Sequence, residues 1–283
     1  MLLLFKPRDQ KYIGEGNLPF GSYDDTSEWL PITRYLEQGA AEFPDKTMFR
    51  VADRDGNLIN THRYRETNEW ANRVANGLIK DYGIKKGDRV GIYMLNSSEF
   101  VVSIIAIHKA GAVQVPINKD EKGDRLAYII NFSEMKVLVV DPESIPMLEE
   151  IAKNLDKLEH IFVTGDPNAV PESIGGIKTL PYSAFDKYQG ENPGLHVRVS
   201  DVERCMFTSG TTGMPKGVSR NHGGVILTVR AYIQQHGVRS GDVLMSVLTL
   251  GHANAQVMCL FTAIGAGATA VFYPRFSASN FWK

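Results

Sequence analysis

The chain has 283 residues, a length that allows one large or two modest α/β units. Hydrophobic residues make up 43% of it and charged residues 22%, which is typical of a globular protein with a sizeable core. Its 31 lysines and arginines nearly balance 32 aspartates and glutamates, so no basic face is predicted that would bind nucleic acid or an anionic membrane as the main partner.

The first part of the chain predicts an irregular arm followed by two helices and a strand. The arm spans residues 1–28, which are rich in Gly, Pro, Asp and Ser. A helix at 32–41 ends near a Phe-Pro pair, and residues 47–52 are strand-like. The clearest helix is 64–82, where apolar residues recur at intervals of four before a glycine ends it.

From residue 85 onwards, short apolar runs alternate with segments of helical spacing. The runs predict strands at 89–95, 113–117, 136–141, 160–164 and 203–208, and the segments between the first four predict helices at 99–110, 125–132 and 145–158. Strands alternating with helices of this length indicate a parallel sheet built through right-handed crossovers. A continuously apolar strand such as 137–140 is expected where helices cover both faces of the sheet.

The alternation breaks at residues 166–199, whose prolines and glycines we interpret as a long surface excursion. After a loop that follows residue 208, the sequence predicts a helix and then two strands separated by another helix, at 224–235, 243–249 and 269–272. Ser277, Ser279 and Asn280 are residue types that begin helices, so a last helix is expected to be cut in its first turn.

The cysteines and the longest apolar stretch indicate a soluble protein of the cytoplasm. Cys205 and Cys259 both lie in apolar runs and are expected to be buried thiols rather than a disulfide framework. Residues 257–273 are interrupted by glycines, so a helix, a turn and a strand explain them better than a membrane span. The first ten residues lack the pattern of a signal peptide. We therefore expect a cytoplasmic protein without a transmembrane segment.

One loop concentrates hydroxyls, glycines and a lysine. The strand that ends at Thr208 runs into the string Ser-Gly-Thr-Thr-Gly-Met-Pro-Lys-Gly at 209–217. Glycines let backbone N–H groups converge on an anion, hydroxyls donate further hydrogen bonds, and Lys216 adds a positive charge. The pattern therefore indicates a polyphosphate-binding loop, against the alternative of a surface turn rich in Gly and Thr.

Two other phosphate-binding patterns are excluded. A P-loop requires Gly-Lys-Ser/Thr, whereas Lys216 lies between Pro215 and Gly217. Residues 265–270 match a relaxed dinucleotide fingerprint, but they follow a predicted helix and open a strand. Because this order is the reverse of the required one, we interpret them as a tight turn.

The loop at 208–217 resembles, nearly residue for residue, the signature of the adenylate-forming superfamily, which includes acyl-CoA synthetases, aryl-CoA ligases, luciferases and peptide-synthetase adenylation domains. Residues 87–118 are similar to an early strand–helix–strand unit of that family, including its Lys-Ala-Gly-Ala turn. Residues 252–256 and 275–282 look most like carnitine/crotonobetaine-CoA ligases and their relatives. The similarity runs from about residue 30 to the end of the chain.

A second motif departs from the family pattern. Residues 248–252 are similar to the Pro-Leu-Phe-His motif of the family's acyl pocket, but Leu250 and Gly251 take the two positions before His252. The resemblance implies that His252 is a catalytic residue beside the acyl carboxylate and the nucleotide. From its chemistry alone, a single histidine between apolar segments is more simply packed and hydrogen-bonded.

The resemblance implies an acid–thiol ligase that uses ATP, Mg²⁺ and coenzyme A. A carboxylate, for example a carnitine-like or a short- or medium-chain acid of fatty acid metabolism, attacks the α-phosphorus of ATP to give an acyl adenylate and pyrophosphate, and the thiol of coenzyme A then displaces AMP. The Thr208 hydroxyl would also bind Mg²⁺. The residues implied to contact the β- and γ-phosphates are Thr208, Ser209, Gly210, Thr211, Thr212, Gly213 and Lys216.

The same resemblance implies an α/β fold with a mostly parallel sheet flanked by helices. Residues 1–283 are then expected to be an incomplete N-terminal AMP-binding domain, with 85–240 as a first α/β subdomain and 28–84 and 241–283 as parts of a second sheet. The later family motifs and the small C-terminal domain with its catalytic lysine are absent from the sequence. We therefore expect residues 1–283 alone to have little or no ligase activity.

Three alternatives stay open. A kinase or NTPase could use the loop for γ-phosphoryl transfer and would form ADP instead of AMP and pyrophosphate. A non-catalytic nucleotide-binding module and an adenylation domain that charges a carrier protein are also compatible with the sequence. The sequence selects no particular acid, and it is compatible with a homodimer.

Overall fold

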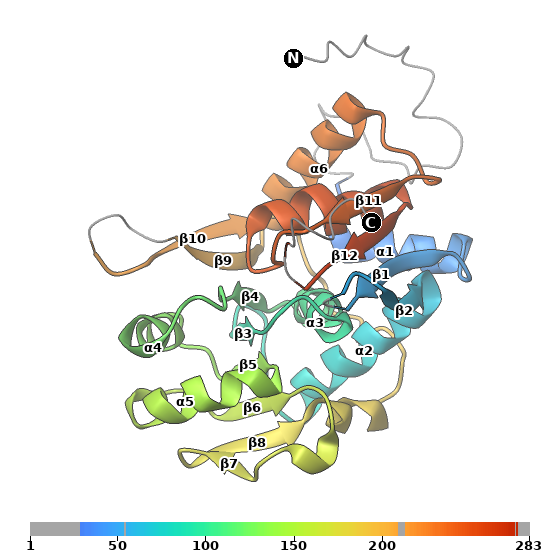
Figure 1. Ribbon diagram of the computed structural model, residues 1–283. Helices are drawn as coiled ribbons and strands as arrows, with labels where there is room; N and C mark the ends of the chain where they lie inside the picture. Colours follow the sequence, from blue (N-terminus) through green and yellow to red (C-terminus); the bar gives the residue numbers. More distant parts are fainter. Residues whose placement is uncertain (1–28, 54, 209–212, 275, 277–283) are drawn as a thin grey trace.

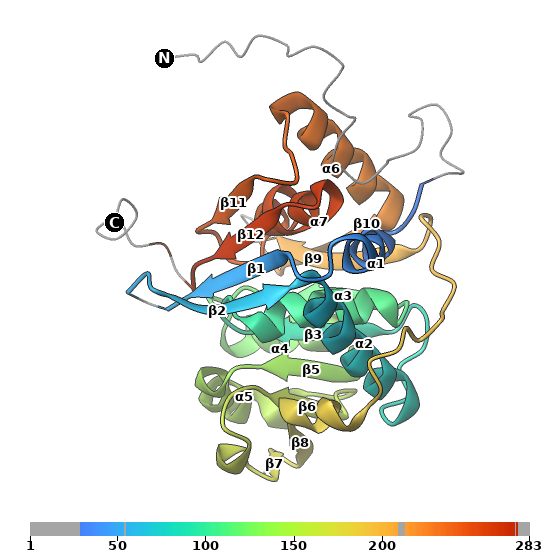
Figure 2. The same ribbon diagram turned by 90° about the vertical axis from the view of Figure 1, so that its right-hand side faces the viewer.

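The computed structural model, which describes residues 29–53, 55–208, 213–274 and 276, is an α/β protein with two sheets (Figures 1 and 2). The larger sheet has eight strands and the smaller has four. The predicted arm at 1–28 and the predicted last helix beginning near Ser277 lie outside the described residues. Within the described ranges, no helix combines the length and the hydropathy that a bilayer crossing requires.

The eight-stranded sheet has the order β10-β9-β4-β3-β5-β6-β8-β7. All neighbours from β9 to β8 are parallel, and only the outer pairs β10–β9 and β7–β8 are antiparallel. The strands are β3 (Arg89–Tyr93), β4 (Val113–Pro116), β5 (Val137–Val140), β6 (His160–Val163), β7 (Ser173–Ile174), β8 (Ile177–Pro181), β9 (Val202–Thr208) and β10 (Lys216–Asn221). The predicted parallel sheet is therefore confirmed, with antiparallel strands added at its edges.

Helices cover both faces of this sheet. The covering helices are α2 (Tyr64–Lys80), α3 (Ser98–Lys109), α4 (Gly123–Phe132) and α5 (Ile145–Ile151), and α4 and α5 lie together on one side in Figure 1. Alternate residues of β5 enter different cores: Val137 and Val139 pack in the cluster that includes α2 and α3, whereas Leu138 and Val140 pack with α4 and α5. Since successive side chains of a strand point to opposite faces, a continuously apolar strand requires this double cover.

The four-stranded sheet combines strands from both ends of the chain in the order β11-β12-β1-β2. Its strands β1 (Thr47–Ala52), β11 (Val243–Ser246) and β12 (Thr269–Phe272) are parallel, and β2 (Leu58–Arg63) is antiparallel to β1. Helices α1 (Ile32–Glu42), α6 (His222–His236) and α7 (Thr262–Ala266) complete this half of the molecule. Helix α2 contacts β1 and β2, α3 contacts β3 and β4, and the two helices contact each other, so this pair joins the two sheets.

Four strands and a short helix correct the sequence-based expectations. The stretch 166–199, which we interpreted as a surface excursion, contains β7, β8 and a 3-10 helix at Tyr182–Lys187. The β7–β8 turn uses Gly175 and Gly176, both at positive φ (58° and 90°), a Gly-Gly hairpin signal hidden in a glycine-rich segment. Strand β2 was not predicted, and β10 lies where the sequence predicts a loop, because almost none of their side chains are buried.

Smaller differences concern the ends of elements. Helix α5 ends at Ile151 and continues as a 3-10 turn at Ala152–Asn154, short of the predicted end at 158. The predicted helix before β12 begins with π-helical residues, Ala255–Phe261, and continues as α7. Gly267 ends it in the left-handed conformation (φ 64°), which supports the tight-turn interpretation of 265–270.

Both cysteines have free thiols in the structure. Cys259 is buried, and burial raises the pKa of its thiol to about 12. Cys205 is half-buried, and burial also raises the pKa of its thiol. The expected thiols are confirmed, with Cys205 only partly buried.

Candidate functional site

The candidate phosphate loop joins the two strands of an antiparallel hairpin. Thr208 is the last residue of β9 and Lys216 the first of β10, and the two face each other across the ladder. The Thr208 hydroxyl donates a long hydrogen bond of 3.5 Å to the carbonyl oxygen of Lys216. Side chains of directly opposed residues lie on the same face of a hairpin, so the Thr208 and Lys216 side chains leave the base of the loop on the same face.

Most of the described part of the loop is open to solvent, although Pro215 is buried. Thr208, Gly213 and Lys216 are exposed, as is Met214. The four predicted phosphate-binding residues Ser209, Gly210, Thr211 and Thr212 lie outside the described residues. The side chains that border the loop are therefore available to a ligand rather than packed inside the protein.

Gly217, next to Lys216, has a steric reason to be glycine. A Cβ atom at this position would lie 2.9 Å from the Sγ atom of Cys205 on the neighbouring strand. Real Cβ atoms do not approach so closely, so any larger residue would displace the thiol or the strand. Gly217 thus allows β10 to pair closely with β9 directly beside the loop.

The segment that carries His252 lies between β11 and the π-helical turn. His252 is exposed, its N–H donates to the Thr249 carbonyl at 3.0 Å, and its own carbonyl accepts from the Gln256 N–H at 3.4 Å. Leu250 is completely buried. A Cβ atom on Gly251 would lie 3.5 Å from the carbonyl oxygen of Ile117, so this glycine packs against the chain just after β4. The departure from the family motif is accommodated with leucine in the core and glycine against the larger sheet.

Thr208 and the His252 segment lie at the same edge of the eight-stranded sheet. Strand β4 is parallel to β9, with Gln114 paired to Arg204, so both strands have their carboxyl ends at one edge. Thr208 ends β9, and Gly251 contacts the residues that follow β4. Ligands of parallel α/β sheets bind outside the carboxyl ends of the strands. The structure therefore brings the two sequence-predicted regions to the edge where a ligand is expected.

The carboxyl ends of both sheets meet at Asn96, which follows β3. Its Nδ2 donates to the carbonyl oxygens of Leu248 and Tyr273, at 2.9 and 2.8 Å. Leu248 comes just after β11 and Tyr273 just after β12. The candidate site is consequently located where the ends of the two sheets are tied together.

A buried polar cluster lies behind this edge and was not predicted. Glu203 is fully buried at the start of β9 and contacts the Nε2 atoms of His108 (3.0 Å) and Gln114 (3.2 Å) and the Nε atom of Arg204 (3.0 Å). Burial lowers the pKa of His222 well below its usual value, and the neighbouring His108 and the charge of Lys86 lower it further. The only sequence signal was a Glu-Arg pair inside an otherwise apolar strand.

A lysine at the same edge is already engaged. The Nζ atom of Lys119 lies 2.7 Å from an oxygen of Asp141 and 2.6 Å from the Ser144 hydroxyl. The other Asp141 oxygen accepts the Leu95 N–H at 2.9 Å. Lys119 therefore braces the ends of the central strands, whereas Lys216 has its side chain in solvent.

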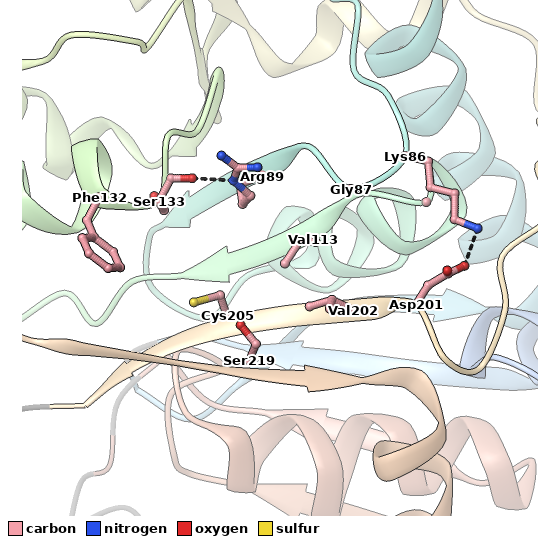
Figure 3. A pocket seen from close by; sticks show the side chains of 11 residues that line it. Lys86, Gly87, Arg89, Val113, Phe132, Ser133, Asp201, Val202, Cys205 and Ser219 are labelled. Atoms are coloured by element: carbon pink, nitrogen blue, oxygen red, sulfur yellow. Dashed lines mark hydrogen bonds and ion pairs between the residues drawn. The ribbon is translucent and has the colours of Figure 1, made fainter.

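A cavity of about 410 Å³ lies at the opposite edge (Figure 3). It opens beside Arg89 and Val113, the first residues of β3 and β4, whereas Thr208 ends β9. Its two cations are paired, Lys86 with Asp201 at 2.5 Å and Arg89 with the Ser133 carbonyl at 2.6 Å. The cavity is therefore separate from the candidate site.

The hydroxyl of Thr208 is a suitable magnesium ligand. Mg²⁺ prefers hard oxygen donors and usually takes only one or two from the protein when phosphates supply others. Across 29–53, 55–208, 213–274 and 276, no group of three or more His, Cys, Asp or Glu residues could form a metal cage. The exposed Thr208 hydroxyl fits a site in which the protein supplies one ligand and the phosphates supply others.

The chain matches a known family over most of its length. The family model described as AMP-binding enzyme matches residues 36–283. The chain is 32% identical over 244 residues to a crotonobetaine/carnitine–CoA ligase of Salmonella agona strain SL483, covering 86% of this chain and 46% of that relative. A crotonobetaine/carnitine–CoA ligase of Escherichia coli O139:H28 is 31% identical over 238 residues, with 82% and 44% covered. The chain spans less than half the length of these curated relatives.

Solved structures share the fold. The anthranilate CoA ligase AuaEII in complex with anthranoyl-AMP has a TM-score of 0.79 and 27% identity, over 89% of this chain and 47% of that one. The inhibitor-bound N-terminal domain of FACL13 from Mycobacterium tuberculosis has a TM-score of 0.76 and 26% identity, over 90% and 60% of the two chains. The two-sheet architecture is thus that of the N-terminal domain of acyl-CoA ligases.

Proposed function

Because the chain belongs to the AMP-binding enzyme family, we propose that it provides the ATP- and acid-binding part of an ATP-dependent acid–CoA ligase. The observation that carries the proposal is the exposed Thr208–Lys216 pair at the same sheet edge as the His252 segment. The names of the curated relatives support a carnitine-like acid as the substrate, and the resemblance in sequence also allows a short- to medium-chain acid.

The hairpin loop holds the polyphosphate of ATP in this proposal. Thr208 and Lys216 contact the β- and γ-phosphates together with residues 209–213. The Thr208 hydroxyl also contributes a ligand to Mg²⁺, which when bound neutralises part of the phosphate charge. Lys216 stabilises the negative charge that moves onto pyrophosphate as the bond to the α-phosphorus breaks.

The acid is activated without a general base. A carboxyl group with a pKa near 4 is already ionised at neutral pH, so one of its oxygens attacks the α-phosphorus directly. Catalysis then depends on holding two anions close together in the correct orientation. His252 orients the carboxylate at the sheet edge that it shares with the phosphate loop. In the second half-reaction the thiol of coenzyme A loses its proton, its sulfur bonds to the acyl carbon, and AMP leaves.

The test is acid-dependent exchange of labelled pyrophosphate into ATP by the complete gene product, measured over a panel of carnitine-like and short- to medium-chain acids. Exchange with at least one acid, and AMP rather than ADP as the nucleotide product, supports the proposal. Formation of ADP would replace it with phosphoryl transfer. Acyl transfer to a carrier protein and not to coenzyme A would change the acceptor while leaving the adenylation step intact.

The activity of residues 1–283 alone is a separate part of the proposal. We expect the 283-residue chain by itself, which spans less than half the length of its curated relatives, to show little or no exchange. Pyrophosphate exchange at the rate of the complete gene product would contradict this expectation.

A further inference from the structure

The His252 segment, residues 247–252, contains no helix or strand. Its backbone is therefore not fixed by a ladder or a helical turn, although a catalytic side chain must be held within a fraction of an ångström. The structure shows a different means of fixing it, in which buried side-chain amides bind its backbone groups.

Side-chain amides bind both polar backbone groups of Leu250. Its N–H donates to Oδ1 of Asn96 at 2.7 Å, and its carbonyl accepts from Nε2 of Gln256 at 2.7 Å. Its side chain is completely buried. Leu250 is thus fixed in three ways, two residues before His252.

Asn96 ties the segment to the ends of both sheets. Its amide uses three hydrogen bonds, two donated to Leu248 and Tyr273 and one accepted from Leu250, and only 4% of the residue is exposed. A buried amide whose partners are all backbone groups cannot be replaced by another group without leaving one of them unpaired.

Gln256 ties the segment to the strand of the phosphate loop. It is fully buried and forms a reciprocal amide pair with Gln114 of β4, with N–O distances of 3.0 and 3.1 Å. Gln114 in turn donates to Glu203 of β9 at 3.2 Å. Nη1 of Arg204, the next residue of β9, donates to Oε1 of Gln256 at 3.5 Å. An unbroken chain of buried hydrogen bonds therefore runs from Leu250 to the strand that ends at Thr208.

We infer that Asn96 and Gln256 are positioning residues that fix the His252 segment relative to the phosphate loop. The inference rests on the proposed function, in which His252 orients the acid while the hairpin holds ATP. If the segment shifts, the acid is misplaced and ATP is not. The affinity for the acid is therefore expected to suffer more than the affinity for ATP.

The test uses isosteric amide-to-carboxyl changes in the complete gene product. Asn96→Asp and Gln256→Glu keep the shape of the side chain but remove its donors. In pyrophosphate exchange we expect each variant to raise the KM for the acid about tenfold and to leave the KM for ATP within about twofold of wild type.

Asn76→Asp is the matched control. Asn76 is also a buried amide (6% exposed) that donates from Nδ2 to two backbone carbonyls, those of Gln189 and Glu191, at 3.1 and 2.8 Å. Asn76 lies on α2, and neither of these two hydrogen bonds involves the His252 segment or the hairpin. Its replacement should cost comparable stability and leave both KM values unchanged.

Each outcome decides the inference. If Asn96→Asp and Asn76→Asp lower activity alike, or if the KM values for acid and ATP rise together, the positioning role is wrong. If the wild-type protein exchanges no pyrophosphate with any acid, the proposed function fails, and amide hydrogen exchange decides the structural part. Faster amide hydrogen exchange over residues 247–252 in Asn96→Asp, but not in Asn76→Asp, would then support the fixed segment. Equal amide exchange in the two variants would overturn it.

Discussion

The hairpin proposed to bind phosphate and the His252 segment reach one edge of the molecule by opposite means. The hairpin strand β10 is exposed along its whole length and is held by its backbone pairing with β9. The His252 segment has no regular structure and is held by the buried side chains of Asn96 and Gln256. We therefore expect a division of roles, in which the exposed hairpin residues affect the proposed chemistry and the buried polar cluster affects placement and stability.

The largest expected effect is on stability, from the buried cluster. Glu203→Ala removes the partner of His108, Gln114 and Arg204 and leaves buried polar groups unpaired. We expect the free energy of unfolding to fall by about 3–5 kcal/mol, measured by chemical denaturation. The control Glu149→Ala, at an exposed position of α5, should change it by less than about 0.5 kcal/mol. Equal effects of the two variants would contradict the structural importance of the cluster.

The hairpin should respond in the opposite way. Lys216→Ala is expected to lower kcat/KM for pyrophosphate exchange about 100-fold, because a preorganised charge at the departing phosphate is lost. Its free energy of unfolding should stay near that of wild type, since the side chain is exposed. Lys153→Ala, at another exposed lysine, is the control and should retain full activity. A Lys216→Ala protein with wild-type exchange would remove the hairpin from the proposed mechanism.

The buried cluster should also make stability depend on pH. Burial lowers the pKa of His222 in the folded protein, whereas the unfolded chain binds the proton with a pKa near 6.5. The unfolded state therefore gains protons first as the pH falls, and stability present above pH 6.5 is lost below it. Between pH 7.5 and 5.5 we expect a loss of about 1.4 kcal/mol from this group.

The contribution of His222 can be isolated by comparing two histidine variants. His222→Gln should reduce the fall in unfolding free energy between the two pH values, whereas His196→Gln, at an exposed position, should not. The same pH dependence in both variants would show that another group is responsible.

The smallest effect sharpens the description of the hairpin. Gly217→Ala places a Cβ atom 2.9 Å from the Cys205 sulfur and should cost about 1 kcal/mol of unfolding free energy. The double variant with Cys205→Ala should recover part of this loss. Gly241→Ala, where a Cβ atom would meet nothing within 4 Å, is the control. If the thiol replacement gives no recovery, the close contact is not the reason for glycine at this position.

The parts of the fold that the sequence predicted well are those buried on both faces. Strand β5 was predicted at 136–141, within one residue of each of its ends, because all four of its residues are apolar and both faces of the strand are covered. Strands β2 and β10 were missed because their exposed side chains carry no alternation of apolar and polar residues. Their place in the sheets follows from backbone hydrogen bonds, which any residue except proline can form.

The candidate site divides in the same way. Thr208 and Lys216 were selected because residues that meet a phosphate must carry particular groups in a particular order, and their role as ligands stays a prediction. Asn96 and Gln256 were not selected, because an amide in the sequence does not reveal its partners. Asn96 binds a carbonyl 177 residues away and Gln256 pairs with an amide 142 residues away.

By itself, the amino-acid sequence determined the family, the α/β class, the parallel strands with apolar faces and the loop rich in hydroxyls and glycines. Only the tertiary structure decided that this loop is the tip of a hairpin, that the carboxyl ends of two sheets meet at Asn96, and that buried amides hold the segment of His252. The physical reason is the range of the interactions. Periodicity and turn chemistry act between near neighbours in the chain, whereas buried hydrogen bonds are formed between residues that only folding brings together.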